Sequence, residues 1–182
     1  EDIFDPLRLL NEKSSKEHTR TFYFDLVDPK AMNPYLVIED LGETGAGALN
    51  IQGAIVSGAR TILDLDGHTG FDLANETVLG FYNVEVKNSD RRNPNNTVNN
   101  TIAKVSNDLA VINVYNSIIN GVITGSTPFT MNITNVQPDS NYSSVENPFT
   151  QLNGAITNAT VNMLAGKLEF GEATLRGSTL VA

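Results

Sequence analysis

The residues best suited to chemistry in this sequence form a short acidic cluster of Asp64, Asp66, His68 and Asp72. Asp64 and Asp66 are two residues apart, so a regular strand places both carboxylates on one face. Carboxylates beside an imidazole can bind a divalent cation or perform general acid–base catalysis. A simpler interpretation is that Asp64 is solvated, Asp66 shapes a turn and His68 packs at a corner. We favour this interpretation, and we expect no catalytic residue, metal site or cofactor.

Two segments of low apolar content, 88–100 and 137–148, are candidates for a binding surface. The first contains Arg91 and Arg92, a pair that can hold a carboxylate or sulfate group. The second contains Tyr142. Loops of repeat scaffolds often carry function, so we expect recognition here if it occurs on loops. The alternative is that both segments are solvated insertions.

The elements that must position these residues are short apolar runs, which begin at Tyr35 and are separated by Gly, Asn, Asp, Ser or Thr. The runs are about three to five residues long, shorter than typical strands. Such strands joined by tight bends favour a solenoid over a sandwich, which needs longer strands. Groups of three runs recur from Gly70, Asp108 and Asn153. They predict a period of roughly 19 to 25 residues and about five or six rungs between residues 36 and 182.

Composition and charge restrict the possible partners. The chain contains 22 Asn residues, which together with Gly, Ser and Thr favour turns and strand surfaces over helices. The net charge of −9 argues against nucleic acid and against anionic membranes, because both require a basic surface. There is no cysteine, which excludes disulfides and thiolate chemistry. No apolar run is long enough for a transmembrane helix.

One phrase carries a family resemblance. Leu63-Asp64-Leu65-Asp66-Gly67-His68-Thr69 resembles a recurrent early-rung phrase of pectin-lyase-like right-handed parallel β-helix proteins, in which Asn is commoner than Asp at the position of Asp66. Leu63 and Leu65 should point inward and Asp64 outward, with Asp66-Gly67 at the bend. The family includes autotransporter passengers, adhesins, phage tailspikes and polysaccharide lyases or hydrolases. The resemblance therefore implies a fold and leaves the activity open.

The predicted fold is all-β, a right-handed parallel β-helix over residues 36–182 with an N-terminal cap over residues 1–35. The cap should contain a short helix from Asp5 to Leu10 and a strand from Thr21 to Val27. Its candidate plugs for the core are Leu7, Leu10, Phe22 and Phe24. The chain stops in an apparent strand near Leu180, so we expect either further rungs or another chain to cover that edge.

These features predict a non-enzymatic extracellular or cell-surface scaffold, similar to bacterial adhesins and autotransporter passengers. Its partners would be host or neighbouring-cell surface molecules or glycans. The alternative is a module that binds or degrades polysaccharide, with Tyr23, Tyr82, Tyr115 and Tyr142 as possible stacking platforms. A groove with exposed aromatic residues and convergent carboxylates would favour that alternative. A purely structural component of an oligomer or shell is the third possibility.

Overall fold

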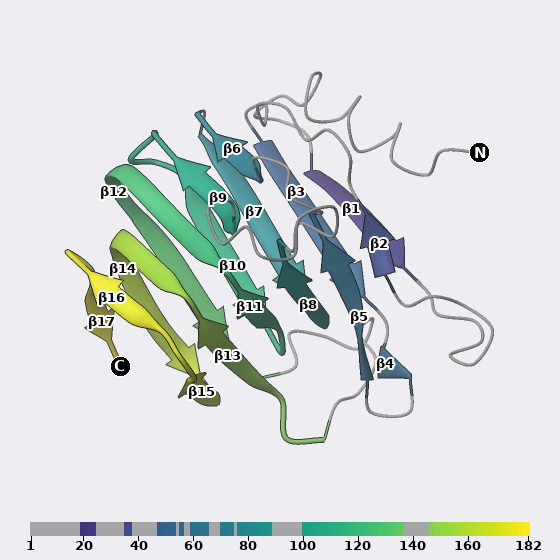
Figure 1. Ribbon diagram of the computed structural model, residues 1–182. Coiled ribbons are helices and arrows are strands. Elements are labelled where there is room, and N and C mark those ends of the chain that lie inside the picture. The colour runs from purple at the N-terminus through teal and green to yellow at the C-terminus, as the bar shows by residue number, and fades with distance from the viewer. Residues whose placement is uncertain are drawn as a thin grey trace.

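The computed structural model describes residues 19–24, 35–37, 47–53, 55–56, 59–65, 70–74, 76–88, 100–136 and 146–182 (Figure 1). These residues are all-β, as predicted, and form no helix that could cross a membrane. The helix predicted from Asp5 to Leu10 lies outside them. The strands are β1 (Thr19–Phe24), β2 (Tyr35–Val37), β3 (Gly47–Gly53), β4 (Ile55–Val56), β5 (Ala59–Asp64), β6 (Phe71–Leu73), β7 (Thr77–Tyr82), β8 (Val84–Lys87), β9 (Thr101–Val105), β10 (Val111–Tyr115), β11 (Ile118–Asn120), β12 (Val122–Thr134), β13 (Phe149–Asn153), β14 (Ala155–Ala165), β15 (Lys167–Phe170), β16 (Thr174–Arg176) and β17 (Thr179–Val181).

The strands form two sheets in which nearly every pairing is parallel. The ten-stranded sheet has the order β1-β3-β7-β10-β12-β14-β16, with β6, β9 and β17 attached to its side. The seven-stranded sheet has the order β15-β13-β11-β8-β5-β2, with β4 attached to β5. The β4–β5 pair is an antiparallel hairpin. Figure 1 shows the chain advancing strand by strand from β1 toward β17. We call one progression from the ten-stranded sheet, through the seven-stranded sheet and back, a pass.

Two strands are much longer than the predicted three to five residues, because each continues through two successive regions of pairing within the ten-stranded sheet. β12 has 13 residues and β14 has 11. The first part of β12 pairs with β9 and the second part with β10. Likewise β14 pairs first with β16 and then with β17. The pairing register between β12 and β14 shifts between Thr124 and Phe129, as at a β-bulge. Strand hydrogen bonding therefore continues round a bend that the sequence pattern predicts as a break.

The length of a pass varies along the chain, which explains why the sequence period is loose. Side-chain hydrogen bonds between equivalent asparagines of successive passes measure this length. The step from Asn83 to Asn116 is 33 residues. The step from Asn113 to Asn132 is 19 residues, and that from Asn132 to Asn162 is 30 residues. The two longer steps contain segments 88–100 and 137–148. The predicted period of roughly 19 to 25 residues matches the shortest of these steps, whereas Ala48 and Val78 are paired 30 residues apart with neither segment between them.

The core consists of apolar side chains stacked along the direction of strand pairing. Alternate residues in a strand face opposite sides, so one inward position repeats in each pass. One row contains Leu49, Leu79, Ile112, Met131 and Val161, all buried. A row of the seven-stranded sheet contains Leu63, Val86, Ile119 and Leu152. Burial of these aliphatic rows is the main force that holds the sheets together.

The two ends of the described strand order can be compared with the predicted N-terminal cap and with the predicted covered edge at the C-terminal end. The strand predicted from Thr21 to Val27 is β1, which begins at Thr19 and ends at Phe24. It pairs in parallel with β3 as an edge strand. Leu7 and Leu10 lie outside the described residues, and the division at residue 35 stays a prediction. At the other end, Phe170 and Leu180 are each 43% exposed although they continue buried rows. That further rungs or another chain cover this edge likewise stays a prediction.

Candidate functional site

The acidic cluster is described only at Asp64 and Asp72. Leu63 and Leu65 are both buried in the core, as predicted from their phrase. Asp64 is also buried, at 0% exposure, so the expectation that it is solvated is wrong. Its Oδ2 lies 3.7 Å from Nζ of Lys87, the residue beside it on β8. A carboxylate at this depth is held by a cationic partner, because an uncompensated buried charge is costly.

The remaining members of the cluster do not extend this ion pair into a described site. Asp72 is half-buried on β6, which belongs to the ten-stranded sheet, whereas Asp64 is on β5 in the seven-stranded sheet. Asp66 and His68 lie outside the described residues. Among the described residues, no group of three or more His, Cys, Asp or Glu is arranged to hold a metal ion. The loop candidates Arg91, Arg92 and Tyr142 also lie outside the described residues.

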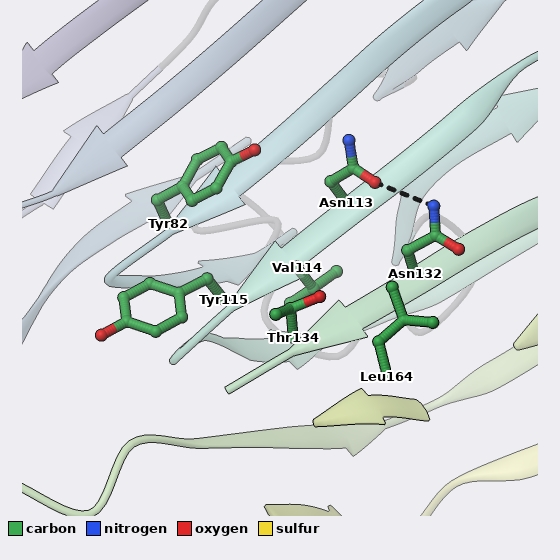
Figure 2. A pocket seen from close by; sticks show the side chains of 7 residues that line it. All are labelled: Tyr82, Asn113, Val114, Tyr115, Asn132, Thr134 and Leu164. Atoms are coloured by element: carbon green, nitrogen blue, oxygen red, sulfur yellow. Dashed lines mark hydrogen bonds between the residues drawn. The ribbon is translucent and has the colours of Figure 1, made fainter. Parts of the chain in front are cut away.

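A pocket of about 180 Å³ opens on the outer face of the ten-stranded sheet (Figure 2). Its lining combines two tyrosines, two asparagines and three other uncharged residues: Tyr82, Asn113, Val114, Tyr115, Asn132, Thr134 and Leu164. Tyr82 and Tyr115 are neighbours in the register of β7 and β10. Both tyrosines were predicted as possible stacking platforms, whereas the asparagines and Leu164 were not predicted to lie here. These residues meet because successive passes bring distant positions of the chain into register.

The asparagines of the pocket belong to a ladder of side-chain amides. Asn113, Asn132 and Asn162 occupy one outward register position in three successive passes. Nδ2 of Asn162 donates to Oδ1 of Asn132 at 3.0 Å, and Nδ2 of Asn132 donates to Oδ1 of Asn113 at 3.1 Å. Each amide thus orients its neighbour and loses rotational freedom before any ligand arrives. The result is a preorganised, uncharged hydrogen-bonding surface.

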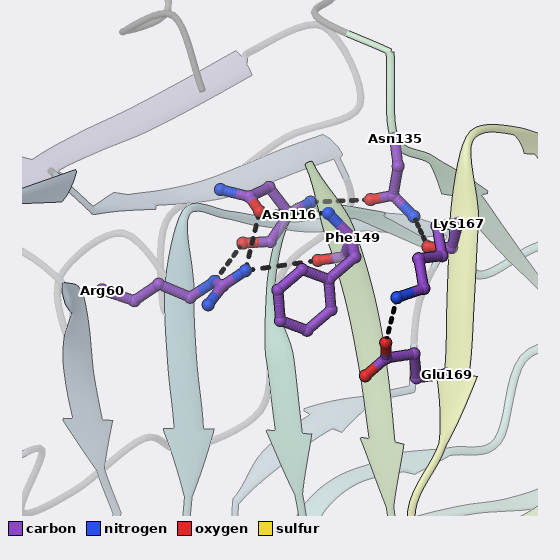
Figure 3. A network of polar contacts seen from close by, with 6 residues as sticks. All are labelled: Arg60, Asn116, Asn135, Phe149, Lys167 and Glu169. Atoms are coloured by element: carbon purple, nitrogen blue, oxygen red, sulfur yellow. Dashed lines mark hydrogen bonds and ion pairs between the residues drawn. The ribbon is translucent and has the colours of Figure 1, made fainter. Parts of the chain in front are cut away.

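A second polar network lies at the corner between the two sheets (Figure 3). Asn116 is buried with φ of 43°, and Asn83 stands one pass earlier with φ of 56°. Asparagine is enriched at such left-handed positions, which a chain needs for a sharp bend. The backbone N–H of Asn116 donates to Oδ1 of Asn135 at 2.9 Å. Thr150 donates its hydroxyl to the same oxygen at 2.8 Å.

Arg60 ties this corner to the strands on either side. Its Nε donates to the carbonyl of Asn116 and its Nη2 to Oδ1 of Asn116, both at 2.7 Å. Its guanidinium also lies 4.5 Å from the ring centroid of Phe149, a cation–π contact. Burial lowers the pKa of Arg60, and the charge of Glu85 opposes that shift. Its partners are 56 and 89 residues away in the chain, so no local sequence pattern indicates this network. The network connects the corner at Asn116 to β5 and β13.

Comparison with known proteins identifies no relative: no protein-family model, curated protein or solved structure matches this chain. The resemblance of Leu63–Thr69 to pectin-lyase-like proteins therefore stays a prediction. The function must be argued from the two sheets and their surfaces alone.

Proposed function

We propose that this chain is a non-enzymatic extracellular or cell-surface scaffold, similar to an adhesin or an autotransporter passenger. In this proposal each pass is one rung of a right-handed parallel β-helix. The observation that carries the proposal is the outer face of the ten-stranded sheet, where the amide ladder and the pocket lie together. Through that face the protein binds molecules on a host or neighbouring cell.

The strand pairing supports the β-helix. The bends in β12 and β14 divide the ten-stranded sheet into two parts, one carrying β10 and β17, the other β9 and β16. With the seven-stranded sheet they make three faces, the number that a three-sided solenoid requires. A stack of rungs also produces parallel strands, with a row of buried side chains running along each face from rung to rung. A stack of this kind is a rigid support for a repeating outer surface.

The surroundings of Asp64 support a structural role for this residue over a catalytic one. Asp64 is buried and lies within ion-pairing distance of Lys87, so its charge is already compensated. Polysaccharide degradation by a β-helix requires carboxylates that reach the substrate in a surface groove. The pocket instead offers amides, hydroxyls and aromatic rings, which bind without transferring protons at neutral pH.

The test is binding of the fluorescently labelled protein to intact epithelial and bacterial cells. We expect saturable binding that weakens at least tenfold in the double variant Asn113→Ala/Asn132→Ala. The matched control is Gln151→Ala/Glu169→Ala, two outward positions of the seven-stranded sheet that should leave binding unchanged. Absence of saturable binding, or equal loss in both double variants, would overturn the proposal.

A parallel assay tests the non-enzymatic part. The purified protein is incubated with neutral and acidic polysaccharides, and new reducing ends and unsaturated uronates are measured. We expect no turnover. Turnover that disappears in Asp64→Asn, with the fold retained by circular dichroism, would identify an enzyme.

A further inference from the structure

The seven-stranded sheet carries an amide ladder of its own, and both of its asparagines are followed by glycine. Asn120 precedes Gly121 and Asn153 precedes Gly154, and no other Asn-Gly pair occurs in the chain. Nδ2 of Asn153 donates to Oδ1 of Asn120 at 2.7 Å, so the two pairs lie side by side in successive passes. Nδ2 of Asn120 donates in turn to Oε1 of Glu85 at 2.8 Å.

An Asn-Gly pair can modify itself without an enzyme, because glycine has no side chain that keeps the reacting atoms apart. The backbone nitrogen of the glycine gives up its proton and attacks Cγ of the asparagine. A bond forms between these two atoms, the bond from Cγ to Nδ2 breaks, and ammonia leaves with the proton. Water then opens the cyclic succinimide at either carbonyl, which yields aspartate or isoaspartate. The net reaction consumes one water, releases one ammonia and replaces the amide by a carboxyl group.

The geometry at Asn120 opposes this reaction. The N–H of Gly121 donates to the carbonyl oxygen of Asn153 at 2.9 Å, and Gly121 is buried. The proton that must leave is therefore bound and shielded from base. The side chain of Asn120 is held at both ends, since it accepts from Asn153 and donates to Glu85. An approach of Cγ to the nitrogen of Gly121 must break all three of these hydrogen bonds between passes.

Asn153 is held less firmly at the equivalent place one pass later. Within the described part of the chain, its side chain makes only the hydrogen bond to Asn120. Gly154 is half-buried, and among the same residues its N–H donates to no backbone carbonyl. The last pass places Gly171 beside this amide, where a Cβ would overlap Oδ1 of Asn153. No side chain at residue 171 can therefore hold the amide in place.

The strands that cover Asn153 are themselves poorly buried. Asn153 ends β13, which pairs with β15, the final strand in the order of the seven-stranded sheet. No residue from 166 to 182 is buried in the described structure. Segments with few buried contacts open locally more often than the core does. Such openings expose the Asn153-Gly154 pair to base and water before they expose Asn120-Gly121.

We propose that Asn153 is a self-modification site of the folded protein, which converts to aspartate or isoaspartate while Asn120 stays protected. Conversion removes the donor of Asn153 and places a carboxylate oxygen opposite Oδ1 of Asn120, so two acceptors face each other. Isoaspartate also lengthens the backbone by one carbon next to Gly154, where the backbone of Gly121 leaves no room for a Cβ. The reaction therefore weakens the contact between these two passes. This inference is independent of the binding role proposed for the ten-stranded sheet.

The experiment follows both asparagines by mass-spectrometric peptide mapping while the folded 182-residue chain is incubated in mildly alkaline buffer. Water enriched in heavy oxygen marks the carboxyl groups that form during the incubation. We expect Asn153 to convert at least about fivefold faster than Asn120. In denaturant the two rates should be similar, because no hydrogen bond between passes remains. Equal rates in the folded protein, or no conversion of Asn153 over a time in which the denatured chain reacts, overturns the proposal.

Asn162 is the matched control within the same protein. Like Asn153, it is the last amide of its ladder and donates to one asparagine of the preceding pass, but Met163 follows it. The methionine side chain hinders attack by the backbone nitrogen, so Asn162 should stay unmodified. Conversion of Asn162 as fast as that of Asn153 would show that the Asn-Gly pair is not the cause.

Variants test the effect on the fold. Asn153→Asp should lower the midpoint of chemical denaturation at once, because its carboxylate faces Oδ1 of Asn120. The unchanged protein should show a falling midpoint as conversion proceeds. Asn153→Gln keeps an amide on a longer side chain that closes the ring much more slowly, so its own midpoint should stay constant during the same incubation. A constant midpoint in the unchanged protein after full conversion would contradict the predicted weakening.

Discussion

Nδ2 of Asn116 donates to Oδ1 of Asn83 at 2.9 Å, although the two residues are 33 positions apart in the chain. Both are buried at a corner where the backbone turns with positive φ. One residue type thus serves two purposes, since the backbone tolerates the bend and the side chain connects successive passes. Such contacts between passes should therefore contribute strongly to the stability of the fold.

Asn116→Ala should be strongly destabilising. It removes a buried hydrogen-bonding hub and places alanine at φ of 43°, with a combined cost of about 3–4 kcal/mol. Asn116→Gly should cost about 1 kcal/mol less, because glycine tolerates the bend. Chemical denaturation measures both. Equal destabilisation by the two variants would show that backbone strain does not contribute.

Lys87→Met should destabilise the protein by about 2–4 kcal/mol, because it removes a cationic partner of the buried carboxylate of Asp64. The matched control is Lys167→Met. Lys167 forms an ion pair with Glu169 at the surface, where such pairs contribute at most about 1 kcal/mol. The double variant Asp64→Asn/Lys87→Met should recover part of the loss. Similar effects of the two lysine variants would mean that the burial of Asp64 is irrelevant to stability.

Stability should fall as pH rises above about 10, partly through Tyr115. Burial raises the pKa of its phenol, so the unfolded state loses this proton at a lower pH than the folded state does. Above the unfolded pKa the unfolded chain binds fewer protons, and the free energy of unfolding decreases with pH. Tyr115→Phe should make the decrease above about pH 10 shallower. An unchanged slope would contradict the assignment to Tyr115.

Gly154→Ala should strongly destabilise the fold. Gly154 has φ of 149°, and an added Cβ would lie 2.1 Å from the carbonyl oxygen of Gly121. Both the backbone conformation and the contact exclude a side chain, so we expect a loss of more than about 3 kcal/mol. Thermal unfolding followed by circular dichroism measures the effect. A variant with near-normal stability would contradict the close approach of these two passes.

Local features of the fold could be predicted from the sequence, whereas contacts between passes could not. Alternation of residue types predicted that Leu63 and Leu65 point inward, and both are buried. The length of β12 was missed, because its bend keeps strand hydrogen bonds that the pattern of apolar runs does not reveal. The expectation that Asp64 is solvated was also wrong, because the burial of an outward residue depends on the segments that pack over its strand.

The candidate site was predicted only in part. Tyr82 and Tyr115 were recognised as aromatic residues, but nothing in the sequence aligned them with Asn132 or Leu164. That alignment depends on unequal steps between passes, and insertions change the step without leaving a periodic signal. The Asn-rich composition was a signal for turns. The asparagines also form ladders of side-chain amides, which could be recognised only from the pairing register of the strands.

The central claim, that the outer face of the ten-stranded sheet is the binding surface, is tested most directly by comparing variants of the two amide ladders in the cell-binding assay. Binding of the labelled Asn113→Ala/Asn132→Ala variant is measured beside that of Asn120→Ala/Asn153→Ala, which alters the ladder on the seven-stranded sheet. We predict at least tenfold weaker binding of the first variant and unchanged binding of the second. Equal binding by the two variants, or a loss confined to Asn120→Ala/Asn153→Ala, would contradict the claim.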